Sequence, residues 1–406
     1  MCRISIFGRS LNETSQTRKG KEHLMRVGID TFGADGGKSG LSQYIIKLLQ
    51  QLALIPNGPE FEVIVYDDEK SLFIPPGDKM APICFSKRLH NPLINLAWHL
   101  VGLPRLCQKR GYDVLFLPAA NRRAPFWLPC PSVGTVHDFS STHVEDKYDK
   151  ARMFFIKRYT PVLIRRLNMV LTVSENSKRD IVSFCGIPEE KVVVTPNGVD
   201  LEVYFPQPGN SALERLQAKY AIRAPYILYV SRIEHPGKNH VRLINAFSQL
   251  KAKTKIPHQL VIAGTPWGRA EEVYDTAARS AYTEDISFIG FVDGSDLPSL
   301  YGAADLFVFP SLYEGFGMPI LEAMACGTPV VCSNVSSMPE VAGDAALLFD
   351  PYDEDDICRV MEEILENDEL SGKLVQKGIE RSGLFSWANA AYKTLEVIYQ
   401  VHEDNT

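Results

Sequence analysis

The chain has 406 residues, of which 45% are hydrophobic and 23% are charged, and its net charge is −6. This composition is typical of a globular protein and excludes collagen-like and disordered chains. The length favours two or three domains at roughly 150 residues each. The eight cysteines are scattered without a C-x-x-C pair, so they indicate thiols in a reducing compartment rather than a disulfide scaffold.

No apolar run approaches the roughly 18 residues that a membrane-spanning helix needs. Residues 1–24 carry five basic side chains but no sustained apolar stretch, so we expect no secretory signal there. We expect residues 1–24 to be a disordered extension, with the first domain starting at Met25. The expected location is the cytoplasm, with the inner face of the cytoplasmic membrane as an alternative.

The charge is distributed unevenly along the chain. Residues 206–406 have a net charge of −12, whereas residues 87–166 hold 14 basic and 5 acidic side chains. The basic region includes the apolar stretch Pro92–Leu106, which is too short to span a membrane but could lie in its interface. Two interpretations stay open: this stretch docks on an anionic membrane, or it is a buried helix among solvated charges.

Short apolar runs alternate with longer amphipathic stretches through most of the chain. Each run is apolar on both faces, which is typical of central strands in parallel sheets. The predicted strands are Arg26–Asp30, Glu62–Tyr66, Val114–Leu117, Ser132–Val136, Met169–Val173, Val192–Thr195, Tyr226–Val230, Gln259–Ala263, Ile286–Ile289, Leu306–Phe309, Pro329–Cys332 and Ala346–Phe349. Helical periodicity covers Leu41–Leu52, Lys238–Leu250 and Trp387–Val401. The alternation predicts an α/β fold built from β-α-β units.

The alternation breaks once, near residues 200–210, where LEVYFPQPGNS contains two prolines and a glycine. This break predicts a linker between two α/β domains of similar size. We therefore expect a first domain over residues 25–205 and a second over residues 206–385. Residues 386–406 form a final helix.

Glycines and polar residues follow several predicted strands. Gly33, Gly36, Gly37 and Gly40 lie between the first strand and its helix, where backbone can approach a ligand and a helix N-terminus can bind an anion. A tight turn explains them equally well. His137 follows another strand, with Asp138 beside it as a carboxylate that could orient the imidazole. A purely structural histidine remains the alternative.

The second half carries more specific signals. Arg232 and Lys238 follow the strand Tyr226–Val230, and two cations beside a helix N-terminus suit a diphosphate. Gly264 holds the equivalent position after the next strand, where a side chain could block a ligand. Glu314 precedes a glycine turn and Glu322 lies one turn into the following helix, so both carboxylates could face one crevice and accept sugar hydroxyls. A solvent-exposed pair is the alternative.

These residues belong to longer runs: S-R-I-E-x-x-x-K-N, then P-S-x-x-E-G-F-G-x-P-x-x-E-A-M-A-C-G-x-P-V-V, then S-S-M-P-E-V. The chain resembles the retaining glycosyltransferases of family 4, the glycogen synthase and mannosyltransferase type, over about residues 25–400. The first half supports the resemblance through its glycine loop, VHD, VSENSKRDI and TPNGVD. The resemblance implies a GT-B fold: two Rossmann-like domains face each other across a cleft, and the last helix crosses back to the first domain.

The resemblance also implies roles for individual residues. Arg232 and Lys238 would neutralise the donor diphosphate, Glu314 would contact the donor sugar, and Glu322 would bind the ribose. His137 would lie over the sugar. The remaining donor-binding residues are the backbone of Phe316, Gly317 and Met318 together with Gly36, Gly37, Gly40 and Gly264. On the acceptor side, Gln43 stands where the family frequently has arginine.

The expected activity is transfer of a hexose, with retention, from a nucleotide sugar to a glycan or lipid-linked acceptor in envelope or exopolysaccharide assembly. UDP-glucose or a related UDP-hexose is the first choice of donor, and GDP-mannose is the second. The resemblance implies that no metal or other cofactor is required. The D-x-D run Asp353, Glu354 and Asp355 is interpreted as acids in the first turn of a helix rather than as a metal site. No nucleic-acid partner is expected.

Two other classes of protein share features of this sequence. One is a catalytically inactive nucleotide-sugar-binding protein of the same fold, against which the joint presence of Arg232, Lys238, Glu314 and Glu322 argues. The other is an NAD-dependent dehydrogenase, which would need a G-x-G-x-x-G loop followed by an acidic residue.

Overall fold

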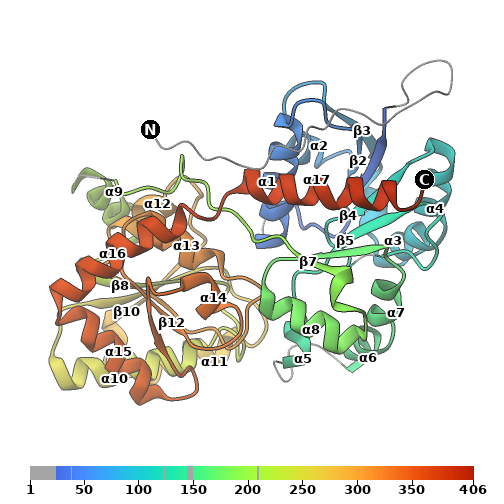
Figure 1. Ribbon diagram of the computed structural model, residues 1–406. Coiled ribbons are helices and arrows are strands. Elements are labelled where there is room, and N and C mark those ends of the chain that lie inside the picture. The colour runs from blue at the N-terminus through green and yellow to red at the C-terminus, as the bar shows by residue number, and fades with distance from the viewer. Residues whose placement is uncertain (1–23, 38, 123, 144–149, 208–209) are drawn as a thin grey trace.

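The computed structural model describes residues 24–37, 39–122, 124–143, 150–207 and 210–406. The extension expected over residues 1–24 therefore lies outside the described residues, apart from Leu24. The described residues form two lobes, each with a central parallel sheet covered by helices (Figure 1). This arrangement confirms the predicted α/β fold with two Rossmann-like domains.

Among the described residues, the first sheet has seven parallel strands in the order β3-β2-β1-β4-β5-β6-β7. Their bounds are β1 Arg26–Asp30, β2 Glu60–Tyr66, β3 Met80–Phe85, β4 Val114–Leu117, β5 Ser132–Thr135, β6 Met169–Thr172 and β7 Val192–Val194. Ile29 of β1 pairs with Val63 on one side and with Phe116 on the other, which places this apolar strand at the centre of the sheet.

Short helices connect these strands. They are α1 Gly40–Leu54, α2 Lys70–Phe73, α3 Pro92–Ala97, α4 Leu103–Arg110, α5 Ser140–His143, α6 Lys150–Arg158, α7 Thr160–Arg165 and α8 Glu175–Cys185, with the 3-10 turns Lys87–His90 and Glu189–Lys191 and the π-helical segment Trp98–Gly102. The helix α1 begins where the hydroxyl of Ser39 accepts a hydrogen bond from the backbone N–H of Ser42, as an N-cap does.

The second sheet has six parallel strands among the described residues, in the order β10-β9-β8-β11-β12-β13. The strands are β8 Tyr226–Val230, β9 Gln259–Ala263, β10 Ile286–Gly290, β11 Leu306–Phe309, β12 Val330–Ser333 and β13 Leu347–Phe349. The helices are α9 Asn210–Tyr220, α10 His240–Thr254, α11 Ala270–Arg279, α12 Leu297–Gly302, α13 Met318–Ala325, α14 Met338–Ala342, α15 Glu354–Leu365, α16 Asp368–Ser382 and α17 Trp387–Glu403, with the 3-10 turn Thr283–Asp285.

The predicted strands agree with these bounds to within two residues, but β3 was not predicted. It lies at the edge of the first sheet, contains Pro82, and leaves several of its side chains partly or fully exposed. Edge strands tolerate proline and lack the continuous apolar pattern of central strands, so the sequence signal for β3 is weak.

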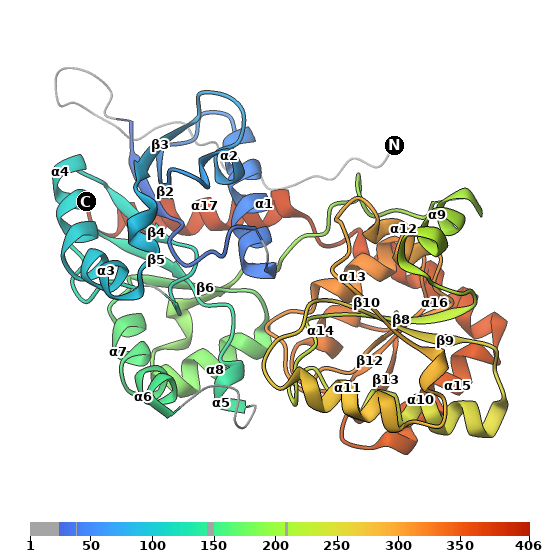
Figure 2. The ribbon, with the colours of Figure 1, turned by 180° about the vertical axis from the view of Figure 1, so that it is seen from behind.

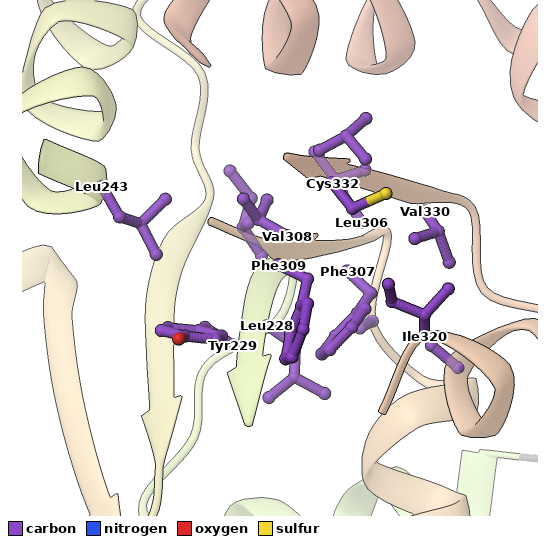
Figure 3. Packing of buried hydrophobic residues seen from close by; sticks show 14 of the residues in the cluster. Leu228, Tyr229, Leu243, Leu306, Phe307, Val308, Phe309, Ile320, Val330 and Cys332 are labelled. Atoms are coloured by element: carbon purple, nitrogen blue, oxygen red, sulfur yellow. The ribbon is translucent and has the colours of Figure 1, made fainter. Parts of the chain in front are cut away.

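The core of the second domain explains why its strands are apolar on both faces. Tyr229, Phe307 and Phe309 are almost completely buried, between Leu243 of α10 on one face and Ile320 of α13 on the other (Figure 3). Burying a large apolar side chain contributes about 1.5–3 kcal/mol. The rigid strands built in this way fix the loops at their carboxyl ends.

The chain passes between the domains twice, and the two passages lie side by side. After β7, the backbone N–H of Val199 donates to the carbonyl of Phe385, which immediately precedes α17 (3.1 Å). The helix α17 then packs against α1 and against β4, β5 and β6 of the first sheet (Figures 1 and 2). Its face formed by Trp387, Ala391, Leu395 and Ile398 is buried in the core of the first domain.

Loops of the two domains also touch directly. The carboxylate of Glu340, from α14, accepts hydrogen bonds from the backbone N–H groups of Glu175 (2.9 and 3.0 Å) and Asn176 (3.3 Å). These N–H groups belong to the first turn of α8, where a helix favours negative charge. The S-S-M-P-E-V and V-S-E-N-S-K runs of the sequence thus meet across the domain boundary.

Candidate active site

A cavity of about 400 Å³ lies where the carboxyl ends of the two sheets face each other. Of the residues proposed from the sequence, eight line this cavity: Gly40, His137, Arg232, Lys238, Glu314, Phe316, Gly317 and Met318. Gly36, Gly37, Gly264 and Glu322 are not among its lining residues. The structure therefore brings together most of the proposed site from segments up to 278 residues apart in the chain.

An ion pair joins two of the second-domain residues that line the cavity. Lys238 Nζ lies 2.5 Å from Glu314 Oε1, and the two side chains are only 18% and 16% exposed. The hydroxyl of Tyr229 donates to the carbonyl of Lys238 (2.8 Å), and the backbone N–H of Glu314 donates to Ser336 Oγ (3.2 Å). Both charged residues are thus held by their backbones before any ligand binds.

Arg232 has a carboxylate partner as well. Its Nη2 lies 3.2 Å from Glu234 Oε2, and its guanidinium stacks over the ring of Trp267 at 5.0 Å from the centroid. The Glu234 side chain is 6% exposed, whereas that of Arg232 is 43% exposed and faces the cavity. Each cation therefore starts from a paired state, so an entering diphosphate has to share or replace a carboxylate.

The turn between Glu314 and α13 forms the deep wall of the cavity. Gly317 has a φ of 103°, a conformation that glycine adopts most readily, and it directly precedes α13. Met318 and Pro319, which begin the helix, line the cavity. Pro319 has no N–H, and the N–H of Ile320 donates to the carbonyl of Gly317 (3.0 Å), so the N–H of Met318 is the group of this turn that can face a ligand.

His137 faces this turn from the first domain. Its Nε2 donates to the carbonyl of Pro118 (2.9 Å), and its ring lies edge-on to Tyr44 with 4.5 Å between centroids. Burial lowers the pKa of His137 to about 4, so the imidazole is neutral near pH 7. With the proton on Nε2, Nδ1 is an acceptor for a ligand hydroxyl.

Asp138, which the sequence suggested as the carboxylate that orients this imidazole, also has partners in the turn after the strand. Its Oδ1 accepts hydrogen bonds from the backbone N–H (2.9 Å) and the hydroxyl (2.7 Å) of Ser140, so it shapes the turn that follows the strand. The carbonyl of Pro118 holds the histidine at Nε2.

The three glycines that do not line the cavity are required by the backbone around them. A Cβ atom on Gly264 would lie 1.8 Å from the carbonyl oxygen of Ser231, so it would collide with backbone before it reached a ligand. Gly36 and Gly37 have φ angles of 65° and 84°, which a tight turn requires. In the same loop, Gln43 Nε2 donates to the carbonyl of Gly37 (3.0 Å) and so braces the turn.

Glu322 is partly exposed and is not among the residues that line the cavity. Its carboxylate accepts a hydrogen bond from the hydroxyl of Tyr301 (2.8 Å). Burial raises the pKa of Glu322 to about 7. Glu322 is thus not among the lining residues of the cavity that Glu314 lines, and ribose binding by Glu322 stays a prediction.

The acids at residues 353–355 lie at the N-terminus of α15, where the sequence predicted the start of a helix. Asp353 is the N-cap of α15, and its Oδ1 accepts from the backbone N–H groups of Asp355 (2.9 Å) and Asp356 (3.3 Å). This carboxylate serves the end of the helix.

Sequence reasoning missed several residues that line the cavity. Asn121 and Arg122 follow β4, Ser140 begins α5 after β5, and Asn197 comes from the run T-P-N-G-V-D after β7. The signal that could have found them is their position after a strand end, because such loops meet at one edge of a parallel sheet.

Known proteins resemble this chain over both domains. Residues 38–203 match the family described as Glycosyltransferase Family 4, and residues 214–381 match Glycosyl transferases group 1. The O-antigen chain mannosyltransferase B of Escherichia coli is 34% identical over 66% of this chain and 71% of its own length. A serotype-specific mannosyltransferase of Escherichia coli is 31% identical over 69% of this chain. The matched part is 34% of that longer protein.

Solved structures share the fold. The sucrose-phosphate synthase of Thermosynechococcus elongatus superposes with a TM-score of 0.74, at 19% identity, over 94% of this chain and all of its own. This likeness confirms the expected GT-B architecture. Together with the two family matches and the relative that is one-third identical, it shows that the chain belongs to the family 4 (group 1) glycosyltransferases with a GT-B fold.

Proposed function

We propose that this protein transfers mannose from GDP-mannose to a lipid-linked glycan acceptor in polysaccharide biosynthesis. Relatives at 30% identity or more that cover about two thirds of the chain carry mannosyltransferase names, which supports a hexosyltransferase of polysaccharide assembly. Two relatives at 31% and 30% identity, which cover 54% and 58% of the chain, are named D-inositol 3-phosphate glycosyltransferases. The mannosyltransferases favour GDP-mannose over UDP-glucose, the donor that the sequence analysis ranked first. The observation that carries the proposal is the pairing of Arg232 and Lys238 with acids on one cavity wall.

The chemistry of the proposed reaction follows from where charge develops. As the diphosphate leaves, negative charge grows on its oxygens, and Arg232, Lys238 and the N-terminus of α13 are positioned to stabilise it. Glu314 is released from Lys238 as the phosphate binds and can then accept a sugar hydroxyl. Retention, as the family resemblance implies, uses the leaving phosphate as the base, so no protein nucleophile is required. We also propose that no metal is required.

The first prediction concerns the donor. In a panel of nucleotide sugars, GDP-mannose should give the fastest transfer, with EDTA leaving the rate unchanged. Arg232→Ala and Lys238→Ala should each lower kcat/KM roughly tenfold to a hundredfold, because a charge-assisted contact contributes about 1.5–3 kcal/mol. Product formation by mass spectrometry measures both effects.

Three outcomes contradict this assignment. Faster transfer from a UDP-hexose overturns the donor, and rates of both variants within twofold of wild type overturn the role of the cations. Tight binding of GDP-mannose without any turnover is the result expected of an inactive nucleotide-sugar-binding protein.

The second prediction concerns Glu322, whose carboxyl group should lower the free energy of unfolding when it ionises in the folded protein. Because burial raises its pKa to about 7, the folded protein avoids the charged form that the unfolded chain adopts above its usual value of 4.5. The free energy of unfolding therefore falls as the pH rises from about 4.5 to about 7. Glu322→Gln lacks this loss, so its stability advantage over wild type should grow between about pH 5 and pH 8 in urea unfolding.

The same variant should bind GDP more weakly, if Glu322 serves the ribose as proposed. A stability difference that is equal at both pH values would show that the carboxyl of Glu322 does not titrate in this range. GDP binding equal to that of wild type in calorimetry would remove Glu322 from the donor site.

We further propose that the first domain docks on an anionic membrane. Leu93, Ile94, Leu96, Leu100 and Val101, from α3 and the π-helical segment, are exposed large apolar side chains within nine residues. Such clustering of exposed apolar side chains marks an interaction surface. The alternative for Pro92–Leu106 was a buried helix, and the exposure of these five side chains contradicts it. Leu103 and Cys107, farther along the chain, are buried. We call the five exposed residues the α3 surface. No helix in the described part of the chain is long and apolar enough to cross a membrane.

Charge and position support this partner. Lys87, Arg88, Arg105 and Lys109 flank the α3 surface and are exposed, whereas Arg110 pairs with Glu62. A smaller cavity beneath Leu96 and Leu100 shares Asn121, Arg122 and Thr160 with the main cavity. An acceptor held by a lipid could thus reach the cleft from this surface.

The third prediction tests docking by co-sedimentation with liposomes. Wild type should bind anionic vesicles at low salt, less at high salt, and neutral vesicles least, because each basic residue near the surface adds about 1 kcal/mol and salt screens it. Leu93→Asp, which changes a side chain that is 77% exposed, should weaken binding. Leu54→Asp, at a site 72% exposed outside the α3 surface, is the matched control. Equal, negligible binding to both kinds of vesicle at low salt would rule docking out.

A further inference from the structure

A large aromatic side chain lies at the surface beside the cavity and takes no part in the core. Trp267, in the loop between β9 and α11, is 55% exposed. It belongs neither to the described core of the second domain nor to the residues that line the cavity. Its ring lies against the guanidinium of Arg232, whose Cζ is 5.0 Å from the ring centroid. Tryptophan side chains are highly buried on average, so the position of this ring against a cation of the site requires a reason.

Backbone hydrogen bonds hold together the two loops that carry the ring and the guanidinium. The backbone N–H of Trp267 donates to the carbonyl of Ile233 (2.9 Å), and the N–H of Ile233 donates to the carbonyl of Thr265 (2.9 Å). The backbone N–H of His235 donates to the carbonyl of Gly268 (3.2 Å). The side chain of Ile233 is only 1% exposed and anchors its loop in the core. The contact between ring and guanidinium is therefore built into the backbone of both loops.

A ring and a carboxylate hold an arginine in different ways. The guanidinium has five N–H donors, all in its plane. A carboxylate accepts hydrogen bonds from these donors, and the carboxylate of Glu234 lies 3.2 Å from Nη2 of Arg232. The ring of Trp267 attracts the cation through its π face and accepts no in-plane N–H. The ring can therefore keep hold of the guanidinium while a phosphate takes over the N–H groups.

Of the two cations on this wall, Arg232 has the greater need of such support. Its side chain is 43% exposed, whereas that of Lys238 is 18% exposed and paired with Glu314. A long, exposed side chain loses rotamer freedom when it binds a ligand, and this loss weakens binding. A ring that restricts Arg232 before the ligand arrives reduces the loss.

We propose that Trp267 is a positioning residue that acts through Arg232. Its ring holds the guanidinium toward the cavity while the N–H groups of Arg232 pass from Glu234 to the diphosphate of the nucleotide sugar. The inference rests on the proposed function in taking a nucleoside diphosphate as the ligand of Arg232. It adds that the ring raises the affinity for the diphosphate without touching it.

A double-mutant cycle on Trp267 and Arg232 tests this role. Calorimetry gives the Kd of inorganic pyrophosphate and of GDP, or of UDP if the donor panel identifies a UDP-hexose. Trp267→Leu should raise both Kd values about threefold to thirtyfold, the range of ring–arginine contacts. Trp267→Phe keeps an aromatic face and should lie between wild type and the leucine variant. When Arg232→Ala is already present, Trp267→Leu should change either Kd less than about twofold, because the ring then has no cation to hold.

The second domain offers a matched control. The ring of Tyr352 is 58% exposed and lies against Arg242, whose Cζ is 5.5 Å from the ring centroid. Neither residue lines the cavity. Tyr352→Leu removes a contact of the same kind and should leave both Kd values unchanged. Pyrophosphate is the second control, because it has no base that the ring of Trp267 could touch.

Two results overturn the inference and leave the proposed function standing. One is an increase in Kd of less than about threefold for Trp267→Leu beside a larger increase for Arg232→Ala. The other is an effect of Trp267→Leu of about twofold or more when Arg232→Ala is present, as a purely structural role or direct contact with the ligand would give. A Kd of Arg232→Ala within about twofold of wild type is a separate result, which contradicts the proposed role of the cation itself.

Discussion

The site depends on how closely the two domains approach at Gly315. A Cβ atom there would lie 2.5 Å from the carbonyl oxygen of His137, so only glycine permits this contact. The carbonyl of Gly315 also accepts hydrogen bonds from the hydroxyls of Ser174 (2.7 Å) and Ser177 (3.3 Å), at the start of α8. The turn that carries Glu314 is therefore pressed against the strand ends that carry His137, and the cavity exists because of that contact.

The cavity wall of the second domain carries two cationic side chains, although that domain as a whole is negatively charged. Residues 206–406 have a net charge of −12, yet Arg232 and Lys238 both reach the cavity wall of that domain. Glu234 and Glu314 hold them there. The acids make it less costly to keep two cations close together without ligand, and they leave the cations positioned for an anion whose charge grows during the reaction.

The sequence predicted those parts of the site that follow a strong strand within a few residues. Arg232, Lys238 and Glu314 were found because the apolar runs before them are unambiguous and parallel strands end at one edge. The surroundings of Gly264 and Glu322 could not be predicted from their positions after a strand. The neighbour of Gly264 is the backbone of Ser231, and the partner of Glu322 is Tyr301, so both depend on contacts between separate loops and helices. The same holds for Asn197, whose surroundings come from α17.

The most direct test of this dependence on domain approach is the transfer rate of Gly315→Ala, measured beside its binding of GDP. Transfer should fall at least about a hundredfold, because the added methyl group forces the domains apart. GDP binding should stay within about threefold, because Arg232 and Lys238 belong to one domain. Gly268→Ala is the matched control, since no described atom lies within 4 Å of its Cβ position. Transfer by Gly315→Ala within twofold of wild type would contradict a site assembled by this contact.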